Sequence, residues 1–203
     1  MRSRITESHF GSSRSRLECE IPFCTFEVLR DSGATAMAEE EEGSWDTTIE
    51  EWLISEGFCY AGSLAQADGA MYAAAPVANE EGWSYVYKED HEETVLNDDM
   101  SEKKMTINEA LCLSTAVADG KAPEGGLWLG GLKYTISQYD AAFESGDYTF
   151  ATIFANRPKK GVHIVSTGSQ IICGFYDEEK SQTTGNCKKS VLAFGEYLKG
   201  IGY

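Results

Sequence analysis

Residues 187–203, CKKSVLAFGEYLKGIGY, form the stretch around which the fold is organised. Apolar residues recur in it at steps of three and four, which is the spacing of one helix face, and charged residues fall between them. The apolar positions are Val191, Phe194, Gly195 and Leu198. The stretch is therefore predicted to be an amphipathic helix docked on a core. Tyr197 flanks that face and Tyr203 is the last residue, so the apolar stripe explains neither tyrosine.

The composition is that of one globular domain. The chain has 203 residues, of which 42% are hydrophobic, and this is enough to bury a substantial core. No run approaches the roughly 18 to 20 apolar residues of a membrane span, and residues 1–30 lack the apolar run of a secretory signal. We therefore expect a cytoplasmic protein without a membrane span.

Charge and cysteine usage exclude several classes of function. Acidic residues outnumber basic ones, 33 against 17, and the formal net charge is −16. A field of that sign repels nucleic acid, so we expect no nucleic-acid partner. The six cysteines show no C-x-x-C spacing and no neighbouring histidine pair, which argues against a zinc site and a disulfide framework. Reduced, mostly buried thiols are expected.

Residues 1–36 differ from the rest of the chain. They hold all but one of the arginines and none of the lysines, and they show neither a helical nor an alternating pattern. We interpret them as a disordered or non-native leader, with the domain spanning residues 37–203. The alternative is a targeting or regulatory arm.

The first half of the domain is expected to hold a helix, a hairpin and an insertion. Ser44 is a suitable N-cap for a helix over residues 45–56, and the patterns at residues 58–64 and 70–75 predict two strands joined by a turn. Residues 83–87 are rich in aromatics and receive no assignment. The charged, mostly acidic residues 88–104 have little to bury, so an exposed insertion is expected at about residues 88–105.

The second half is expected to be mostly sheet. Thr106 and Glu109 have the spacing of a capping box, which predicts a helix from there to Asp119. Four apolar or alternating runs follow as predicted strands, at residues 127–136, 148–155, 162–166 and 170–176. The order of elements predicts an α+β fold with a central antiparallel β-sheet and the N- and C-terminal helices packed together on one face.

Four motifs in order resemble the profilin family. They are SWD at 44–46, APEGGLWLGGLKY at 122–134, YDE at 176–178, and GEYL at 195–198 with the final GY. The insertion, together with YKED at 87–90 and DEEK at 177–180, is most similar to the apicomplexan-parasite branch. The resemblance implies a profilin-like, non-enzymatic, monomeric protein of the cytoplasm and cytoskeleton that needs no cofactor. It also implies two partners, monomeric actin, whose polymerisation the protein would regulate, and proline-rich segments such as those of formins.

The resemblance implies a platform for proline-rich segments between the terminal helices. A polyproline II ligand is already extended, so it loses little entropy on binding, and flat aromatic rings can stack against it. The matching positions are Trp45, Tyr72, Tyr197, Leu198 and Tyr203. Thr48 stands where many profilins have an aromatic, so a smaller platform is expected. The alternative for Trp45 and Tyr72 is plain packing between helix and sheet.

The resemblance places the actin surface on the last strands and the start of the final helix. The candidate residues are Lys133, Thr135, His163, Lys188 and Lys189. Actin is acidic, and in a chain this negative a cluster of lysines can steer association. The alternative is that these lysines are ordinary solvated surface residues.

Two other classes of function compete with this one. A rival is a secreted or released ligand that host Toll-like receptors recognise through its acidic arm, at Glu89, Asp90, Glu92, Glu93, Asp98 and Asp99. A third possibility is a small-molecule sensor domain, since the scaffold resembles such domains. The glycine pairs lack the pattern of a phosphate-binding loop, and the acids lack the spacing of a calcium loop, so no metal site is expected.

Overall fold

The computed structural model describes residues 44–96 and 102–203. The chain divides into two units, Met1–Glu39 and Glu40–Tyr203, and the described residues all belong to the second. The expected leader at residues 1–36, and Asp98 and Asp99 of the acidic arm, lie outside the described residues.

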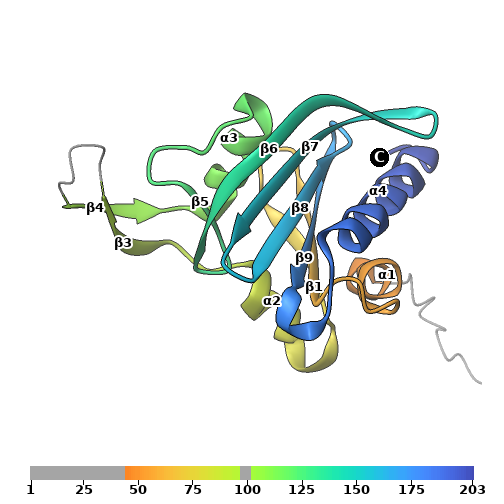
Figure 1. Cartoon of the computed structure of the whole chain (residues 1–203), viewed down its shortest axis with the longest axis horizontal. Coiled ribbons are helices and arrows are strands. Elements are labelled where there is room, and N and C mark those ends of the chain that lie inside the picture. The colour runs from red at the N-terminus through yellow and green to blue at the C-terminus, as the bar shows by residue number, and fades with distance from the viewer. Residues whose placement is uncertain (1–43, 97–101) are drawn as a thin grey trace, which may run out of the picture. The chain divides into compact units, whose positions relative to one another are not determined.

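A seven-stranded antiparallel sheet is the centre of the fold, with strand order β2-β1-β9-β8-β7-β6-β5 (Figure 1). Its strands are β1 (Ala61–Gln66), β2 (Met71–Ala75), β5 (Leu127–Leu129), β6 (Leu132–Ser145), β7 (Tyr148–Arg157), β8 (Lys160–Ser166) and β9 (Gln170–Asp177). The predicted hairpin is β1 and β2, and the predicted meander is β5 to β9. Pairing of β1 with β9 joins the two into one sheet.

The run at residues 127–136, predicted as one strand, is two. β5 and β6 form a hairpin about Gly130 and Gly131, whose φ angles are 60° and 71°. Only glycine adopts two successive left-handed conformations without strain, and this turn type suits a two-residue hairpin loop. β6 also continues to Ser145, paired with β7, well beyond the predicted end. The pattern missed this outer half because it is largely exposed and carries no apolar alternation.

Helices cover both faces of the sheet. α1 (Trp45–Ile49) continues as the π-helical turn η1 (Glu50–Ile54), and it packs with α4 (Thr184–Gly200) on one face, as predicted for the terminal helices. α3 (Glu109–Asp119) lies against the other face (Figure 1). The unassigned aromatic stretch is α2 (Glu81–Val86), and two short 3-10 turns complete the set, η2 (Ala78–Glu80) and η3 (Glu178–Lys180).

The predicted capping box at Thr106 is wrong. Thr106 belongs to a strand, and α3 is capped instead by Asn108, whose side-chain oxygen accepts a hydrogen bond from the Leu111 N–H at 2.8 Å. Asn is as good an N-cap as Thr, so the pattern alone could not choose between them. Glu109 is then free of a capping role, and its carboxylate is buried.

The exposed insertion expected at about residues 88–105 contains two paired strands. β3 (His91–Leu96) and β4 (Glu102–Ile107) form a separate two-stranded antiparallel sheet. The side chains at the less exposed positions of β3 are those of His91, Glu93 and Val95. Because two of these three are polar, the sequence of β3 does not show the apolar–polar alternation of a strand. The His91 ring packs edge-on against Trp128, with centroids 5.8 Å apart.

Glycines in the central strands let the terminal helices approach the sheet. A Cβ atom at Gly174 of β9 would lie 2.3 Å from Val191 Cγ2 of α4, and one at Gly62 of β1 would lie 2.6 Å from Leu53 Cδ1 of η1. The two glycines are register partners across β1 and β9. η1 and α4 therefore both approach the sheet closely at this pair of neighbouring glycines.

Candidate functional site

Aromatic side chains from α1, η1 and α4 meet along the contact between the terminal helices. Trp45 packs edge-on against Tyr203, with ring centroids 5.3 Å apart, and Trp52 stacks on Tyr197 at 5.0 Å. The start of α1 thus meets the end of the chain, and η1 meets the C-terminal half of α4, so the helices run antiparallel. Together with Tyr72, these four residues are called the aromatic strip below.

Most of the strip is accessible to a ligand. The exposed fractions are 36% for Trp52, 37% for Tyr197 and 42% for Tyr203, while Trp45 and Tyr72 are half-buried. Tyr203 is held in place because its N–H donates to the Leu198 carbonyl at 2.9 Å, after a turn through Gly202. Exposed aromatics held by backbone contacts form a preorganised surface, which lowers the entropy cost of binding.

Tyr72 anchors the strip to the sheet. It lies on β2, and its hydroxyl donates to Gln170 Oε1 at 2.9 Å. Burial raises the pKa of Tyr72 to about 12, and the neighbouring Tyr203 adds to the effect. The phenol therefore stays neutral at physiological pH and acts as a hydrogen-bond donor with an apolar ring.

Two residues of the platform differ from expectation. Leu198 is fully buried in the core, so it cannot touch a ligand there, and it contributes only the carbonyl that holds Tyr203. Trp52 belongs to the strip, although the sequence places it only within the helix predicted over residues 45–56. Sequence alone does not show which apolar residue of a helix stays exposed. Trp52 stands one helical turn after Thr48, where the expected aromatic is missing.

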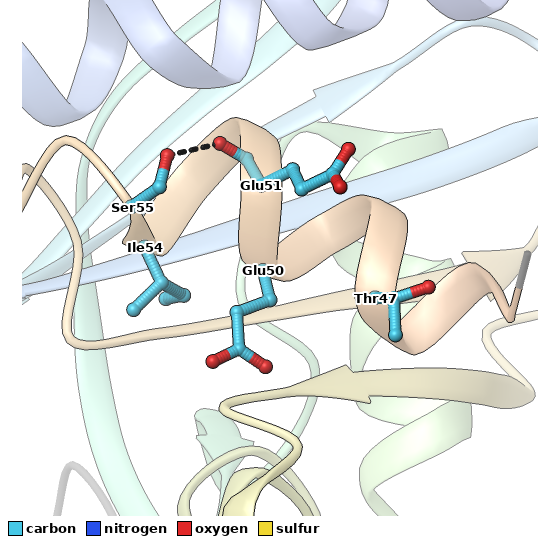
Figure 2. Close-up of a pocket in the computed structure, with 5 residues that line it drawn as sticks. All are labelled: Thr47, Glu50, Glu51, Ile54 and Ser55. Carbon is cyan, nitrogen blue, oxygen red and sulfur yellow. Dashed lines mark hydrogen bonds between the residues drawn. The ribbon is translucent and has the colours of Figure 1, made fainter.

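Hydrogen bonds fix α1 against the edge strand β2. Asp46 Oδ1 accepts from the Ala74 N–H at 2.7 Å, and Glu50 Oε2 accepts from the Val77 N–H at 2.9 Å. An open pocket of about 310 Å³ lies beside α1 and η1. Figure 2 shows residues that line it, with the side chains of Glu50 and Glu51 leaving the helix in different directions. The Glu50 carboxylate thus accepts a backbone hydrogen bond, whereas the Glu51 carboxylate does not.

His163, one of the predicted actin-binding residues, is stacked and buried. The His163 ring stacks on Phe154 of the neighbouring strand at 4.8 Å, and its Nε2 forms a 2.8 Å hydrogen bond with Thr184 Oγ1 in the first turn of α4. Burial lowers the pKa of His163 to about 4, and the nearby Lys188 contributes to this shift. Because only 6% of the residue is exposed, it supports the surface more than it contacts a partner.

The other predicted actin residues divide into two places. Lys188 lies with its Nζ 4.1 Å from the centre of the Phe143 ring, and it lines a small hollow with His163. Lys189 beside it is exposed. Lys133 and Thr135 are exposed on β6 and border a different open pocket that includes Lys121. The structure therefore groups His163 with the start of α4 and leaves the β6 pair separate.

Glu109 organises the hairpin that carries Lys133. Its carboxylate is 1% exposed and accepts three backbone hydrogen bonds, from Lys88 at 2.9 Å, Gly130 at 2.9 Å and Gly131 at 2.6 Å. Burial raises the pKa of Glu109, although the three N–H groups oppose the shift. No sequence pattern signals this role, because the donors are backbone atoms far along the chain.

The acids of the predicted recognition arm are not equivalent. Asp90 Oδ1 accepts from Asn108 Nδ2 at 2.8 Å, and Glu93 lies 3.9 Å from Lys88 Nζ. Glu89 and Glu92 are exposed. Asp90 and Glu93 thus contact the base of the hairpin, while Glu89 and Glu92 face solvent.

Comparison with known proteins identifies the family. The family model of profilin matches residues 43–203. The chain belongs to the profilin family. It is similar to the profilin of Plasmodium falciparum (isolate 3D7), with 33% identity over 165 residues that cover 78% of this chain and 96% of that protein. The profilin of Plasmodium berghei is also 33% identical over 165 residues, covering 78% and 94%. This profilin is therefore of the apicomplexan branch.

Solved profilins share the fold. Profilin IB of Acanthamoeba castellanii matches with a TM-score of 0.54 and 19% identity, over 79% of this chain and all 100% of that one. Profilin II of the same organism matches with a TM-score of 0.53 and 18% identity, over 79% and 100%. The α+β fold with a central antiparallel sheet and packed terminal helices is thus that of a profilin.

Family membership sets the general role. Profilins are non-enzymatic actin-binding proteins, so this profilin is in general an actin-binding regulator. Within residues 44–96 and 102–203, no helix has the length and apolar character needed to cross a membrane. The described residues also contain no group of three or more His, Cys, Asp or Glu placed to hold a metal ion.

Proposed function

We propose that this profilin binds monomeric actin through the start of α4 and the adjoining strands, and binds proline-rich segments, such as those of formins, on the aromatic strip. The observation that carries the proline part of the proposal is the pairing of aromatic rings along the terminal helices, Trp45 with Tyr203 and Trp52 with Tyr197, of which all but Trp45 are exposed. Family membership supports both partners.

The aromatic strip suits a polyproline II ligand. Such a ligand has three residues per turn and no internal hydrogen bonds, and it presents pyrrolidine rings to flat apolar surfaces. The Trp45 and Tyr203 pair and the Trp52 and Tyr197 pair offer two successive ring platforms along the helices. Tyr72 adds a ring whose hydroxyl is already bonded to Gln170.

The start of α4 suits an acidic partner. Lys188 and Lys189 lie together there in a chain whose formal net charge is −16, so a local positive patch interrupts a negative field. Opposite charges steer encounter and fix orientation more than they add affinity. With both partners bound, actin is held close to the proline-rich segment, and its effective concentration near an elongation machine rises.

The actin proposal is tested by polymerisation of purified actin. This profilin is expected to suppress spontaneous polymerisation in a concentration-dependent way, and the Lys188→Glu/Lys189→Glu double variant is expected to need a higher concentration. Lys103→Glu/Lys104→Glu, on the separate β3–β4 sheet, makes the same change of charge and serves as the control. If wild-type protein in stoichiometric excess leaves polymerisation unchanged, the actin proposal is wrong.

The proline proposal is tested by tryptophan fluorescence on titration with poly-L-proline. Trp45→Ala and Tyr203→Ala are expected to abolish or strongly weaken binding. Tyr139→Ala is the matched control, because Tyr139 is exposed to 37%, like Tyr197, but lies on β6. Normal binding by both Trp45→Ala and Tyr203→Ala would exclude the aromatic strip as the site. The described residues offer no observation that favours the receptor-ligand or sensor alternatives.

A further inference from the structure

A second open pocket adjoins the aromatic strip between η1 and α4. Its volume is about 440 Å³. The lining residues are Glu51, Trp52, Glu56, Ser190 and Ala193. The same Trp52 ring stacks on Tyr197, so the pocket opens directly beside one of the two ring platforms.

The pocket combines an accessible indole with two carboxylates. Trp52 is 36% exposed, and Glu51 and Glu56 are exposed as well. Among residues 44–96 and 102–203, neither of these carboxylates takes part in an ion pair or a side-chain hydrogen bond. The two carboxylates that line the pocket therefore have no positively charged partner in the described part of the chain.

We propose that this pocket binds the side chain of an arginine or lysine next to the prolines of a segment seated on the aromatic strip. The inference rests on the proposed proline binding and specifies which proline-rich segments are preferred. Charge complementarity argues for this occupant, because the pocket offers two carboxylates within a chain of net charge −16. An acidic residue at the same place would be repelled.

Arginine fits the lining best. Its planar guanidinium stacks on aromatic faces and forms paired hydrogen bonds with carboxylates, while its methylene stem can lie along Ala193 and the indole. A neutral side chain of similar length, such as glutamine, keeps the stem contacts and loses the charge. The difference in affinity between the arginine and glutamine peptides therefore measures the contribution of charge to recognition.

The test compares three peptides of about ten prolines that end in Arg, Gln or Glu, titrated into full-length protein by tryptophan fluorescence. The Arg peptide is expected to bind about three- to tenfold more tightly than the Gln peptide, and the Glu peptide more weakly than both. In the Glu51→Gln/Glu56→Gln variant the Arg advantage is expected to vanish. It should persist in Glu89→Gln/Glu92→Gln, which removes the same charge from the insertion.

The outcomes separate this inference from the function on which it rests. Equal binding of the three peptides to wild-type protein overturns the inference and leaves proline binding intact. Failure of all three to bind overturns the proposed proline binding itself. An Arg advantage that survives in Glu51→Gln/Glu56→Gln, or is lost equally in the control variant, assigns the preference to the general negative field and overturns the pocket.

Discussion

At the scale of single residues, His163 makes the stability of this profilin depend on pH. Its pKa is about 4 in the folded protein, against 6.5 for an unperturbed histidine, so the unfolded chain binds the extra proton first as pH falls. The stabilising contribution is complete above pH 6.5 and is lost between pH 6.5 and about 4. The difference corresponds to up to about 3 kcal/mol of unfolding free energy.

Urea unfolding of wild type and His163→Gln across this pH range measures the effect. The variant is expected to be less stable at pH 7, because it loses the stack on Phe154, and the gap between the two proteins should narrow toward pH 4. Parallel pH profiles for the two proteins would show that His163 does not carry the dependence.

Glu109 is a second residue whose role is structural and measurable. Glu109→Ala leaves the N–H groups of Lys88, Gly130 and Gly131 without their acceptor in a buried place, which is expected to cost about 3 kcal/mol. Amide hydrogen exchange should accelerate at Gly130 and Gly131. Glu92→Ala, an exposed site, is the control and should change neither stability nor exchange. Unchanged protection of the two glycine amides in Glu109→Ala would contradict this role.

At the scale of elements, the distance between α4 and the sheet is set by Gly174. In Gly174→Ala the new methyl would lie 2.3 Å from Val191 Cγ2, so α4 must shift, and the cost is expected to be about 2 kcal/mol. Thermal unfolding measures the loss. Adding Val191→Ala to Gly174→Ala should recover part of the lost stability. If it does not, the steric conflict of the new methyl group is not with Val191.

Gly185 provides the matched control for this prediction. It lies in the first turn of α4, and a Cβ atom there would meet no atom within 4 Å. Gly185→Ala is therefore expected to raise stability by about 0.5–1 kcal/mol, because alanine loses less backbone entropy than glycine in a helix. Both substitutions add one methyl group. Their expected effects on the free energy of unfolding are opposite, because Gly185→Ala improves helix propensity and Gly174→Ala creates a steric conflict.

The elements also show what could be predicted from the sequence. The terminal helices were predictable because their apolar residues keep a helical period, and β7 to β9 because they are apolar runs between clear turns. The β3–β4 hairpin was not, because His91 and Glu93 occupy inward positions normally held by apolar residues. The start of α3 was misplaced because Thr106 and Asn108 are both good N-caps.

The candidate site was predicted only in part, for a related reason. Trp45, Tyr197 and Tyr203 were assigned through the family resemblance, and the structure brings them together at the surface. Leu198 was assigned on the same basis and is buried. Its burial agrees with its place on the apolar face of the C-terminal helix, so the helical repeat was the better guide to Leu198 than the resemblance.

At the scale of the whole molecule, α4 carries both proposed surfaces and keeps them apart. Lys188 stands in its first turns and Tyr203 just beyond its end, and the helical steps from Lys188 to Gly200 span about 18 Å. Because the prolines on the aromatic strip lie toward the C-terminal end of α4 and Lys188 lies in its first turns, actin and a proline-rich segment are expected to bind together. Competition would require either a shift of α4 as a unit, which its close contact with the sheet at Gly174 opposes, or an actin contact that reaches along the helix to the aromatic strip.

The prediction is that saturating poly-L-proline changes the concentration of this profilin needed to suppress actin polymerisation by no more than about twofold. Tyr203→Ala should lose proline binding and keep suppression, whereas Lys188→Glu should show the reverse. Poly-L-proline that abolishes suppression by wild type but not by Tyr203→Ala would show that the two ligands exclude one another. In that case α4 couples the surfaces, and the actin contact must extend along the helix to the aromatic strip.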